Sequence, residues 1–398
     1  MHMHLIERND YMSRLISLKD KDFIKVLSGI RRSGKSTLLE MFKTHLLESG
    51  IKESCILHIN MDSWDVKKRI TNKSELYKFI KENVSGERSY VFIDEIQNIR
   101  GWEDVAIAVY TDMDVDLYIT GSNALMLSSD LSTKLVGRYI EIQVFPLSFK
   151  EFKGFFTESE KMEAFNEYLR FGGFPGVIKI SDERNRNDAI ESIYRTILSS
   201  DVVMKNNIKD VALMERLAEY LMGNVGNITS IKKISDYLNS SGIKTNPVTV
   251  DNYILMLVRS YLIYKAKRYD IKGKKVLKSL DKYYVTDIGL KNMVNPQTDL
   301  GHSIENLVYF ELLRKGYQVY VGTIDQTEID FIAKKGSDIT YFQVSMTILD
   351  EAVRERELAP FKKIPDSHDR VILTLDRIIT DNIDGIRCMN IVDFLLKY

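Results

Sequence analysis

The residue types best suited to chemistry lie together between Gly29 and Thr37, in the sequence GIRRSGKST. Gly29 to Ser36 fits the pattern G-x-x-x-x-G-K-[ST] in full. The two glycines let the backbone turn so that successive N–H groups point into one concavity, which suits phosphate. Lys35 adds a positive charge for the β- and γ-phosphates, and the Ser36 hydroxyl suits Mg²⁺. We therefore expect ATP and Mg²⁺ to bind here, against the alternative of a chance glycine-rich turn. The residues expected to contact the nucleotide are Gly29, Arg31, Arg32, Ser33, Gly34, Lys35, Ser36 and Thr37.

A second chemical signal is the acidic pair Asp94-Glu95, which follows the apolar run from Tyr90 to Ile93. An apolar strand that ends in Asp-Glu is the Walker B pattern. Asp94 would orient the Mg²⁺ shell, and Glu95 would polarise the attacking water. The alternative is a solvated acidic pair at the end of a strand. Because a complete phosphate-binding motif lies upstream, we favour a hydrolytic pair, with Ser36 and Asp94 as the expected metal ligands.

Asn123 and Arg138 are two further candidates. Asn123 follows the apolar run 115–120 and can hold the lytic water or sense the γ-phosphate; otherwise it is a turn residue. Arg138 precedes the expected fifth strand, where an arginine can reach the γ-phosphate of a neighbouring subunit. A structural salt bridge is the alternative for Arg138, and a homo-oligomer is expected only if this arginine acts in trans. The full set of expected catalytic residues is Glu95, Asp94, Lys35, Asn123 and Arg138.

The elements that must position these residues alternate between strand and helix. Short apolar runs predict strands, and segments with apolar residues three and four apart predict helices between them. Such alternation is typical of an α/β fold with a parallel sheet. We expect strands at 23–27, 54–60, 90–93, 115–120 and 139–145, helices at 5–22, 73–84 and 101–112, and another helix directly after Lys35. The first domain is expected to cover residues 1–147.

Length and composition set limits on the rest of the chain. The 398 residues exceed one typical core, so two to four domains are expected. Lys plus Arg and Asp plus Glu both number 56, so any nucleic-acid footprint must be local. The two cysteines, Cys55 and Cys388, form no disulfide framework or metal spacing. No signal peptide and no apolar stretch long enough for a membrane span is evident, so a cytoplasmic location without a membrane partner is expected.

The middle of the chain reads as a helical linker or lid over 148–222, followed by a winged helix over 223–298. Ser148 is a plausible N-cap for the first helix, and the sequence FGGFPG at 171–176 breaks any helix. Arg170 lies just before this break. It could act as a nucleotide sensor in a lid, but we favour a structural role. Two helices and a hairpin around Lys272-Gly273-Lys274 indicate the winged helix. Lys272, Lys274 and Lys275 are the candidate double-stranded DNA contacts in the most basic stretch of the chain, although winged helices also bind proteins.

Several segments resemble one known family in the same order along the chain. GIRRSGKSTLL, VFIDEIQN, ITGSNA and LVGRYIEIQVFPLSFKEF are similar to the prokaryotic AAA+-type ATPases with a GxRRxGKSTLL signature. The resemblance implies a P-loop sheet with an extra strand between the Walker A and Walker B strands. It also implies nucleotide-site roles for Lys35, Ser36, Asp94, Glu95, Asn123 and Arg138.

The segments VTDIGL, GHSIENLVYFEL, EIDFIA, YFQVSM and RERE resemble the C-terminal module usually fused to this ATPase. The element order over 299–398 resembles the restriction-endonuclease-like PD-(D/E)XK fold. The shared order is a helix, three strands, a helix and a strand. A metal-dependent nuclease of this fold needs an acid on the first helix, an Asp on the second strand and Glu-x-Lys on the third. Glu305 and Asp330 are present, and Glu328 can substitute as a ligand on the face of Asp330. The third strand instead carries Gln343 and Ser345, so a degenerate nuclease fold retained for binding or assembly is favoured over an active nuclease.

Three hypotheses follow. The first is an ATP-hydrolysing AAA+-type switch coupled to a DNA-associated winged helix and a nuclease-like region. The second is a DNA nuclease gated by ATP. The third is a nucleotide-locked scaffold that binds DNA or protein without significant catalysis.

Overall fold

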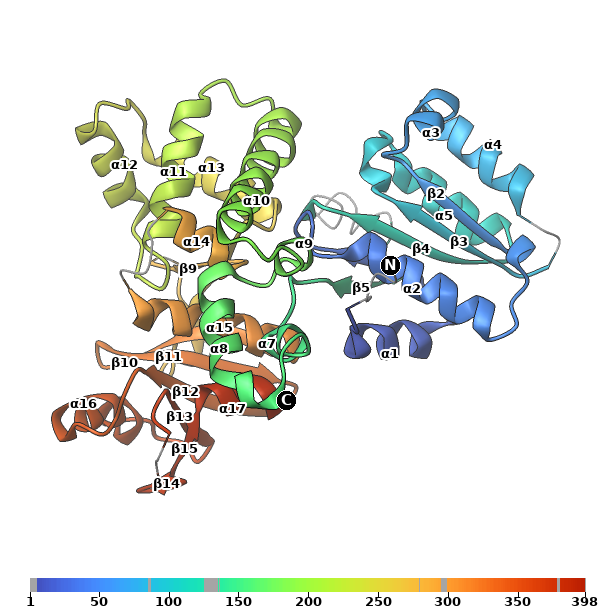
Figure 1. Ribbon diagram of the computed structural model, residues 1–398. Helices are drawn as coiled ribbons and strands as arrows, with labels where there is room; N and C mark the ends of the chain where they lie inside the picture. The colour runs from blue at the N-terminus through green and yellow to red at the C-terminus, as the bar shows by residue number, and fades with distance from the viewer. Residues whose placement is uncertain are drawn as a thin grey trace. The chain divides into compact units, whose positions relative to one another are not determined.

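The computed structural model describes residues 6–84, 87–124, 135, 137–278, 280–294, 299–377 and 380–397. The chain forms two compact units (Figure 1). The first contains Met1–Pro146 together with Arg259–Tyr261, and the second contains Leu147–Val258 and Leu262–Tyr398. The finer division into four domains at residues 147, 222 and 298 stays a prediction.

The first unit is built on a five-stranded sheet with the order β2-β3-β4-β1-β5. Every neighbouring pair in it is parallel. Strand β4 lies between β1, which precedes the glycine-rich loop, and β3, which ends in the acidic pair. The predicted parallel α/β sheet is therefore confirmed, including its extra strand. The strands are β1 (Ile24–Ser28), β2 (Ile56–Asn60), β3 (Ser89–Asp94), β4 (Val115–Gly121) and β5 (Tyr139–Gln143).

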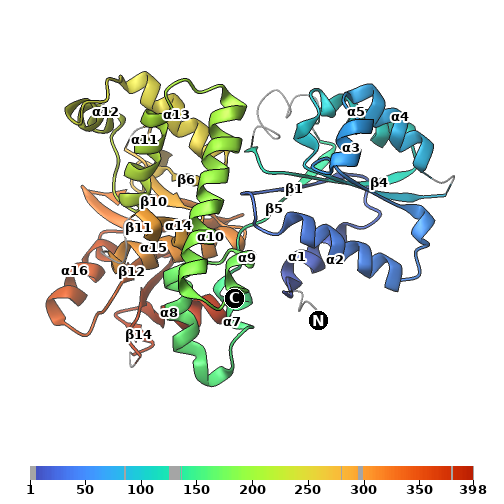
Figure 2. The same cartoon turned by 45° about the horizontal axis from the view of Figure 1, so that its top comes forward.

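Helices cover both faces of this sheet (Figure 2). Helices α1 (Asn9–Leu18) and α2 (Lys35–Glu48) bury apolar residues on one face, and α4 (Lys73–Asn83) and α5 (Trp102–Asp112) bury theirs on the other. The short α3 (Trp64–Arg69) has no fully buried residue and was not expected from the sequence. The central strands β1, β3 and β4 are buried at every position because helices cover both faces of the sheet, whereas the edge strands β2 and β5 are partly exposed.

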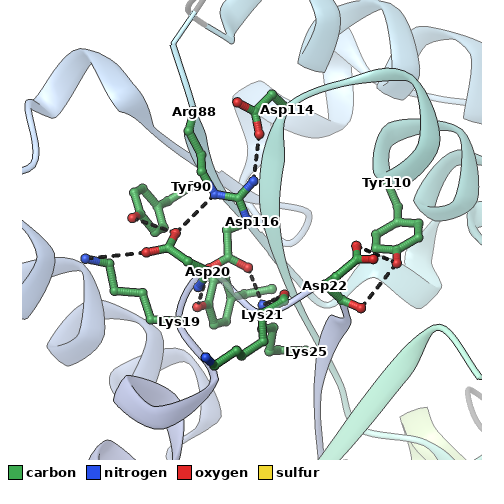
Figure 3. A network of polar contacts seen from close by, with 11 residues as sticks. Lys19, Asp20, Lys21, Asp22, Lys25, Arg88, Tyr90, Tyr110, Asp114 and Asp116 are labelled. Carbon is green, nitrogen blue, oxygen red and sulfur yellow. Dashed lines mark hydrogen bonds and ion pairs between the residues drawn. The ribbon is translucent and has the colours of Figure 1, made fainter.

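An ionic network lies at the edge where β1, β3 and β4 begin (Figure 3). The ammonium group of Lys25 pairs with Asp116 on the neighbouring strand, and both side chains are at most 1% exposed. Asp116 also accepts hydrogen bonds from Tyr118 Oη at 2.9 Å and from the backbone N–H of Asp20 at 2.8 Å. Arg88 donates to Asp20 at 3.1 Å. This edge is opposite the one that carries the glycine-rich loop, so the network bears on stability.

The second unit opens with helices. Ser148 caps α7 as predicted, because its hydroxyl accepts from the N–H of Glu151 and the Glu151 carboxylate accepts from the N–H of Ser148. Helices are present in the expected linker 148–222, and so are the two helices expected before the hairpin at Lys272. These elements are α7 (Phe149–Lys153), η4 (Glu158–Glu160), α8 (Lys161–Phe171), α9 (Pro175–Ile178), α10 (Glu183–Thr196), the π-helical η5 (Ile197–Met204), α11 (Val211–Gly223), α12 (Ile231–Ser240), α13 (Pro247–Arg259) and α14 (Ile288–Val294).

An eight-stranded mixed sheet dominates the rest of the second unit, with the order β14-β15-β13-β12-β11-β10-β7-β8. The hairpin expected as a wing is split: its base, β6 and β9, forms a separate two-stranded sheet, and its tip, β7 and β8, joins the large sheet beside β10. These elements are β6 (Ile263–Ala266), β7 (Arg268–Asp270), β8 (Lys275–Val276), β9 (Lys282–Val285), α15 (Leu300–Arg314), β10 (Gln318–Ile324), β11 (Thr327–Lys335), β12 (Asp338–Ser345), α16 (Glu351–Lys362), β13 (Asp369–Thr374), β14 (Asn382–Ile383), β15 (Ile386–Asn390) and α17 (Ile391–Lys397).

From α15 to β13 the element order is helix, three strands, helix, strand, as the sequence indicated. Both cysteines are buried, and neither forms a disulfide. Within the described ranges, no helix is both long and apolar enough to cross a bilayer.

Candidate nucleotide site

The glycine-rich loop turns sharply from β1 into α2. Gly29 has φ +141°, and a Cβ built on it would lie 2.1 Å from the carbonyl oxygen of Val144, so no other residue fits there. Gly34 has φ +97° at the N-terminus of α2. The ammonium group of Lys35, on a side chain that is 4% exposed, donates to the carbonyl oxygens of Gly29 and Ile30, each at 3.0 Å. The lysine thus places its charge inside the concavity of the loop.

The remaining loop residues differ in exposure. The hydroxyls expected to meet the nucleotide and its metal belong to Ser36 and Thr37, and both residues are exposed at the start of α2. Arg32 is exposed and Arg31 half-buried. Ser33 is fully buried, and its hydroxyl has no hydrogen-bond partner among the described residues. A buried hydroxyl without a partner is costly, so this loop is suited to a polar ligand.

Arg8 supports the glycine-rich loop through a hydrogen bond to the loop backbone. The sequence did not predict this role. Its guanidinium donates to the carbonyl oxygens of Ser33 at 2.9 Å and Phe145 at 3.0 Å, and it lies 4.5 Å from the ring centroid of Tyr11. The side chain is 3% exposed. Because these partners are 25 and 137 residues away along the chain, no local pattern could reveal this role.

The acidic pair ends β3 at the same edge of the sheet as the loop. Ile93, just before Asp94, is level with Ile119 across the β3–β4 pair, and Ser28, just before the loop, is level with Gly121 across the β1–β4 pair. Since strands are about 4.8 Å apart, the end of β3 lies roughly 10 Å from the end of β1. Asp94 is 3% exposed and Glu95 9%. The sheet therefore brings the acidic pair to the phosphate loop.

Three polar side chains fix this pair, and the sequence pattern did not single them out. Thr120 donates its hydroxyl to the Asp94 carboxylate and accepts from the backbone N–H of Glu95 at 3.0 Å. Ser122 donates to the Glu95 carboxylate at 3.2 Å, and the amide of Gln97 donates to the same oxygen. Glu95 has φ +54°, a left-handed conformation that these contacts hold. Thr120 and Ser122 flank Gly121 in ITGSN, so the polar strand end that indicated Asn123 also contains them.

Asn123 and Arg138 lie in different places. Asn123 is 4% exposed and lies two residues after β4, at the edge that holds the acidic pair. Arg138 is exposed and precedes β5 at the opposite edge, where its carbonyl oxygen accepts from the N–H of Ile24 at 2.8 Å. A five-residue strand is about 16 Å long, so Arg138 is far from the loop of its own chain. If Arg138 contacts a nucleotide, that nucleotide must be bound to a second copy of the chain.

The residues present fit Mg²⁺ with a triphosphate. Mg²⁺ takes oxygen ligands, and Ser36 and Asp94 supply a hydroxyl and a carboxylate at the edge that holds Lys35. The backbone concavity, the Lys35 ammonium group and the N-terminus of α2 together favour a multiply charged anion.

The lysines expected to contact DNA lie on the β7–β8 hairpin. Lys272 pairs with Asp325 at 2.5 Å, and both side chains are about half exposed. Lys274 and Lys275 are exposed, and β8 is the edge strand of the sheet. Lysines on an edge strand also keep other strands from pairing with it, so their presence has a structural explanation as well.

Arg170 has structural partners. Its guanidinium pairs with Glu183 and lies 4.9 Å from the ring centroid of Phe171.

The carboxylates expected for a nuclease come from α15 and β11. Glu305 and Asp330 are buried, and Glu328 is 31% exposed. Burial, and then the charge of Glu305, raise the pKa of Asp330 well above its usual range. The side-chain oxygen of Gln343 accepts from the backbone N–H of Asp330 at 3.3 Å, and its amide donates to Glu357 at 3.0 Å.

Comparisons with known proteins agree with the fold of the first unit. Residues 21–153 match the AAA domain family, and residues 162–301 match a domain of unknown function, DUF8612. A Walker-type ATPase of Pyrococcus abyssi covers 73% of this chain and 96% of its own, with a TM-score of 0.49 and 18% identity. At that TM-score the likeness carries no argument, so the agreement rests on the match to the AAA domain family.

Two relatives align over most of the chain. The uncharacterized protein MJ1544 of Methanocaldococcus jannaschii is 29% identical, over 93% of this chain and 85% of its own length. An uncharacterized protein of Haemophilus influenzae is 37% identical over the full length of both chains. The chain therefore belongs to the family of this Haemophilus influenzae protein, and it carries an AAA domain with the P-loop ATPase fold.

Proposed function

We propose that this protein is a magnesium-dependent ATPase of the AAA+ type. The observation that carries the proposal is the assembly of Lys35, Asp94 and Glu95 at one edge of a five-stranded parallel sheet. Lys35 would leave the carbonyl oxygens of the loop and bind the β- and γ-phosphates. Ser36 and Asp94 would hold Mg²⁺, which when bound supplies charge that shields the phosphates.

Glu95 is the proposed general base. Its carboxylate would polarise the attacking water, while Ser122 and Gln97 restrict its orientation. Asn123, at the end of β4, would position the same water. Thr120 fixes Asp94 through its hydroxyl and holds the backbone of Glu95, so both acids depend on one threonine.

Phosphate release from ATP tests this assignment. Glu95→Gln should keep nucleotide binding and lower turnover by about 10²–10⁴-fold, because general-base catalysis contributes about that much. Lys35→Ala should weaken binding itself, since it removes the charge aimed at the phosphates. Lys78→Ala and Glu82→Gln are matched controls, because these residues are exposed on α4 and form only a weak pair at 3.8 Å.

The outcomes separate the hypotheses. If Glu95→Gln and Lys35→Ala both hydrolyse ATP like the parent, the assignment is wrong. If the parent binds nucleotide but does not turn over, the nucleotide-locked scaffold replaces the ATPase.

We also propose that the nucleotide state is coupled to the second unit through Leu147, four residues after β5. Its N–H donates to the carbonyl oxygen of Gly173 at 2.7 Å. Its carbonyl oxygen accepts from Tyr168 Oη at 2.7 Å and from Arg314 at 3.4 Å. Movement of β5 would thus act on α8, α15 and the loop at Gly173.

Double-stranded DNA is the partner that we propose for the second unit, and the exposed Lys274 and Lys275 support it. Changing Lys272, Lys274 and Lys275 to Gln should weaken a gel shift and reduce its dependence on salt. The reason is that each lysine that neutralises a phosphate adds roughly 1 to the salt slope. The same change to Lys67, Lys78 and Lys81 in the first unit is the control. Binding that does not respond to salt would contradict this role.

Nuclease activity is not part of the proposal. The third strand carries Gln343 and Ser345 in place of the acid and the lysine that a metal-dependent nuclease needs.

A further inference from the structure

Lys282 is a buried lysine that enters the carboxylate cluster of the second unit from a neighbouring element. It begins β9 and is 3% exposed. Its ammonium nitrogen lies 3.0 Å from a Glu305 oxygen and 2.6 Å from a Glu328 oxygen. One cation therefore bridges the helix α15 and the strand β11.

The rest of the cluster is also occupied by protein groups. Tyr284 Oη donates to the same Glu305 oxygen at 2.6 Å. The backbone N–H of Val344 donates to the Asp330 carboxylate at 2.8 Å. Ser345, at the position that would hold the nuclease lysine, donates its hydroxyl to the carbonyl oxygen of Thr347 at 2.9 Å. Each carboxylate of the cluster already has a donor from the protein.

The residues do not fit the divalent metal that a nuclease of this fold requires. Mg²⁺ needs several oxygen ligands at about 2.0–2.1 Å, with room for water between them. Here an ammonium group lies between two of the carboxylates, so a metal would meet a like charge at contact distance. Gln343, the expected neutral ligand, is engaged by Asp330 and Glu357. Across the described part of the chain, no three acidic, histidine or cysteine side chains are grouped so that they could hold a metal ion.

We propose that the Lys282 ammonium group is a counter-ion that takes the place of the metal. The cluster, here called the tie, is then a buried network of ion pairs and not a nuclease centre. The tie joins β9 to α15 and β11. It thereby fixes the base of the β6–β9 hairpin to the nuclease-like elements. A nuclease-like arrangement of carboxylates is retained for this structural purpose.

Manganese binding to the full chain without nucleotide tests the proposal, with free Mn²⁺ measured by electron paramagnetic resonance. The number of Mn²⁺ ions bound by the parent should be the same in Asp330→Asn, because the cluster of the parent holds no metal. Lys282→Ser should gain one site that binds at least tenfold tighter than any parent site, because the carboxylates then lack a counter-ion. Lys282→Ser/Asp330→Asn should lose that site.

Lys265→Ser is the matched control. Lys265 lies on the same hairpin and pairs with Asp281 at 2.7 Å, outside the cluster. It should gain no Mn²⁺ site. Thermal unfolding gives a second readout: Mn²⁺ should raise the melting temperature of Lys282→Ser and leave that of the parent unchanged, because a ligand stabilises only the form that binds it.

Two results would overturn the proposal. One is a parent Mn²⁺ site that survives Lys35→Ala and is lost in Asp330→Asn, together with plasmid cleavage that follows the same pattern. Lys282 would then act beside a metal instead of replacing it. The other is a folded Lys282→Ser protein, with the circular dichroism spectrum of the parent, that gains neither Mn²⁺ binding nor a Mn²⁺-dependent melting temperature. The first result depends on no Lys282 variant, so it decides the question even if Lys282→Ser does not fold.

Discussion

Lys25 and Lys35 are both buried in the first unit, but their partners give them different roles. Lys35 donates to carbonyl oxygens of a loop and can exchange them for a ligand. Lys25 faces the buried carboxylate of Asp116 at the opposite edge of the sheet. Burial lowers the pKa of Lys25, although Asp116 opposes that shift. A lysine that is paired so deeply contributes to folding only while its partner is present.

Lys25→Met should therefore destabilise the first unit by about 3–5 kcal/mol, because it leaves the buried carboxylate of Asp116 without its counter-ion. Urea unfolding measures the change. Lys67→Met is the matched control: Lys67 pairs with Asp62 at 3.1 Å, and both side chains are almost half exposed. The destabilisation by Lys67→Met should stay within about 1 kcal/mol.

The double variant Lys25→Met/Asp116→Leu should recover part of the stability, since it removes the buried charge that has lost its counter-ion. The recovery is incomplete because Tyr118 Oη and the N–H of Asp20 lose their acceptor. A Lys25→Met protein as stable as Lys67→Met would show that the buried pair contributes nothing.

At the scale of elements, Asp287 ties the loop after α8 to the start of α14. Its carboxylate accepts from the N–H of Gly173 at 2.7 Å and from the N–H of Gly289 at 2.9 Å. A Cβ on Gly172, where φ is +73°, would lie 1.8 Å from this carboxylate. The sequence FGGFPG was expected to break a helix. In addition, the backbone of Gly173 lies close to the backbone of Leu147 and to the side chain of Asp287, and it forms a hydrogen bond with each of them.

Asp287 should also make stability depend on pH. Burial raises its pKa to about 6. Because the folded state then binds a proton more tightly than the unfolded state, this residue stabilises the fold at low pH. That contribution of about 3 kcal/mol is lost as pH rises from roughly 4 through 6.

Urea unfolding of the parent and of Asp287→Asn at pH 4.5 and 7 measures this contribution. Asn does not titrate, so any decrease in the free energy of unfolding from pH 4.5 to pH 7 should be smaller for Asp287→Asn than for the parent. Asp325→Asn, at an exposed position, is the control. An identical pH dependence in the parent and in Asp287→Asn would contradict the assignment.

At the scale of the whole molecule, Arg138 lies at the sheet edge opposite the proposed nucleotide site, so a role in hydrolysis would require a second copy of the chain. If Arg138 acts on the nucleotide of a second copy, the turnover per chain should rise with protein concentration. Arg138→Ala should abolish that rise and lower the maximal rate by up to about 10³-fold, with nucleotide affinity unchanged.

Light scattering with and without an ATP analogue measures the assembly in the same samples. Arg69→Ala, at an exposed position on α3, is the control. Turnover per chain that is independent of concentration, and equal in Arg138→Ala, would assign Arg138 a structural role.

The sequence by itself determined the strands and the local motifs of the first unit. Gly29, Gly34 and Lys35 lie within one turn, and the end of an apolar strand marks Asp94, so short-range rules place them. The resemblance also implied an extra strand between the Walker A and Walker B strands, whereas the full order β2-β3-β4-β1-β5 came from the structure.

Only the tertiary structure decided the partners that are distant along the chain. Arg8 under the loop, Thr120 beside Asp94 and Lys282 among the carboxylates each contact residues at least 23 positions away. The hairpin at Lys272 was predicted, but its attachment to β10 was not, because strand pairing between residues so far apart leaves no local pattern. A hydrogen bond or ion pair between residues far apart in the sequence forms only when tertiary packing brings the two residues together.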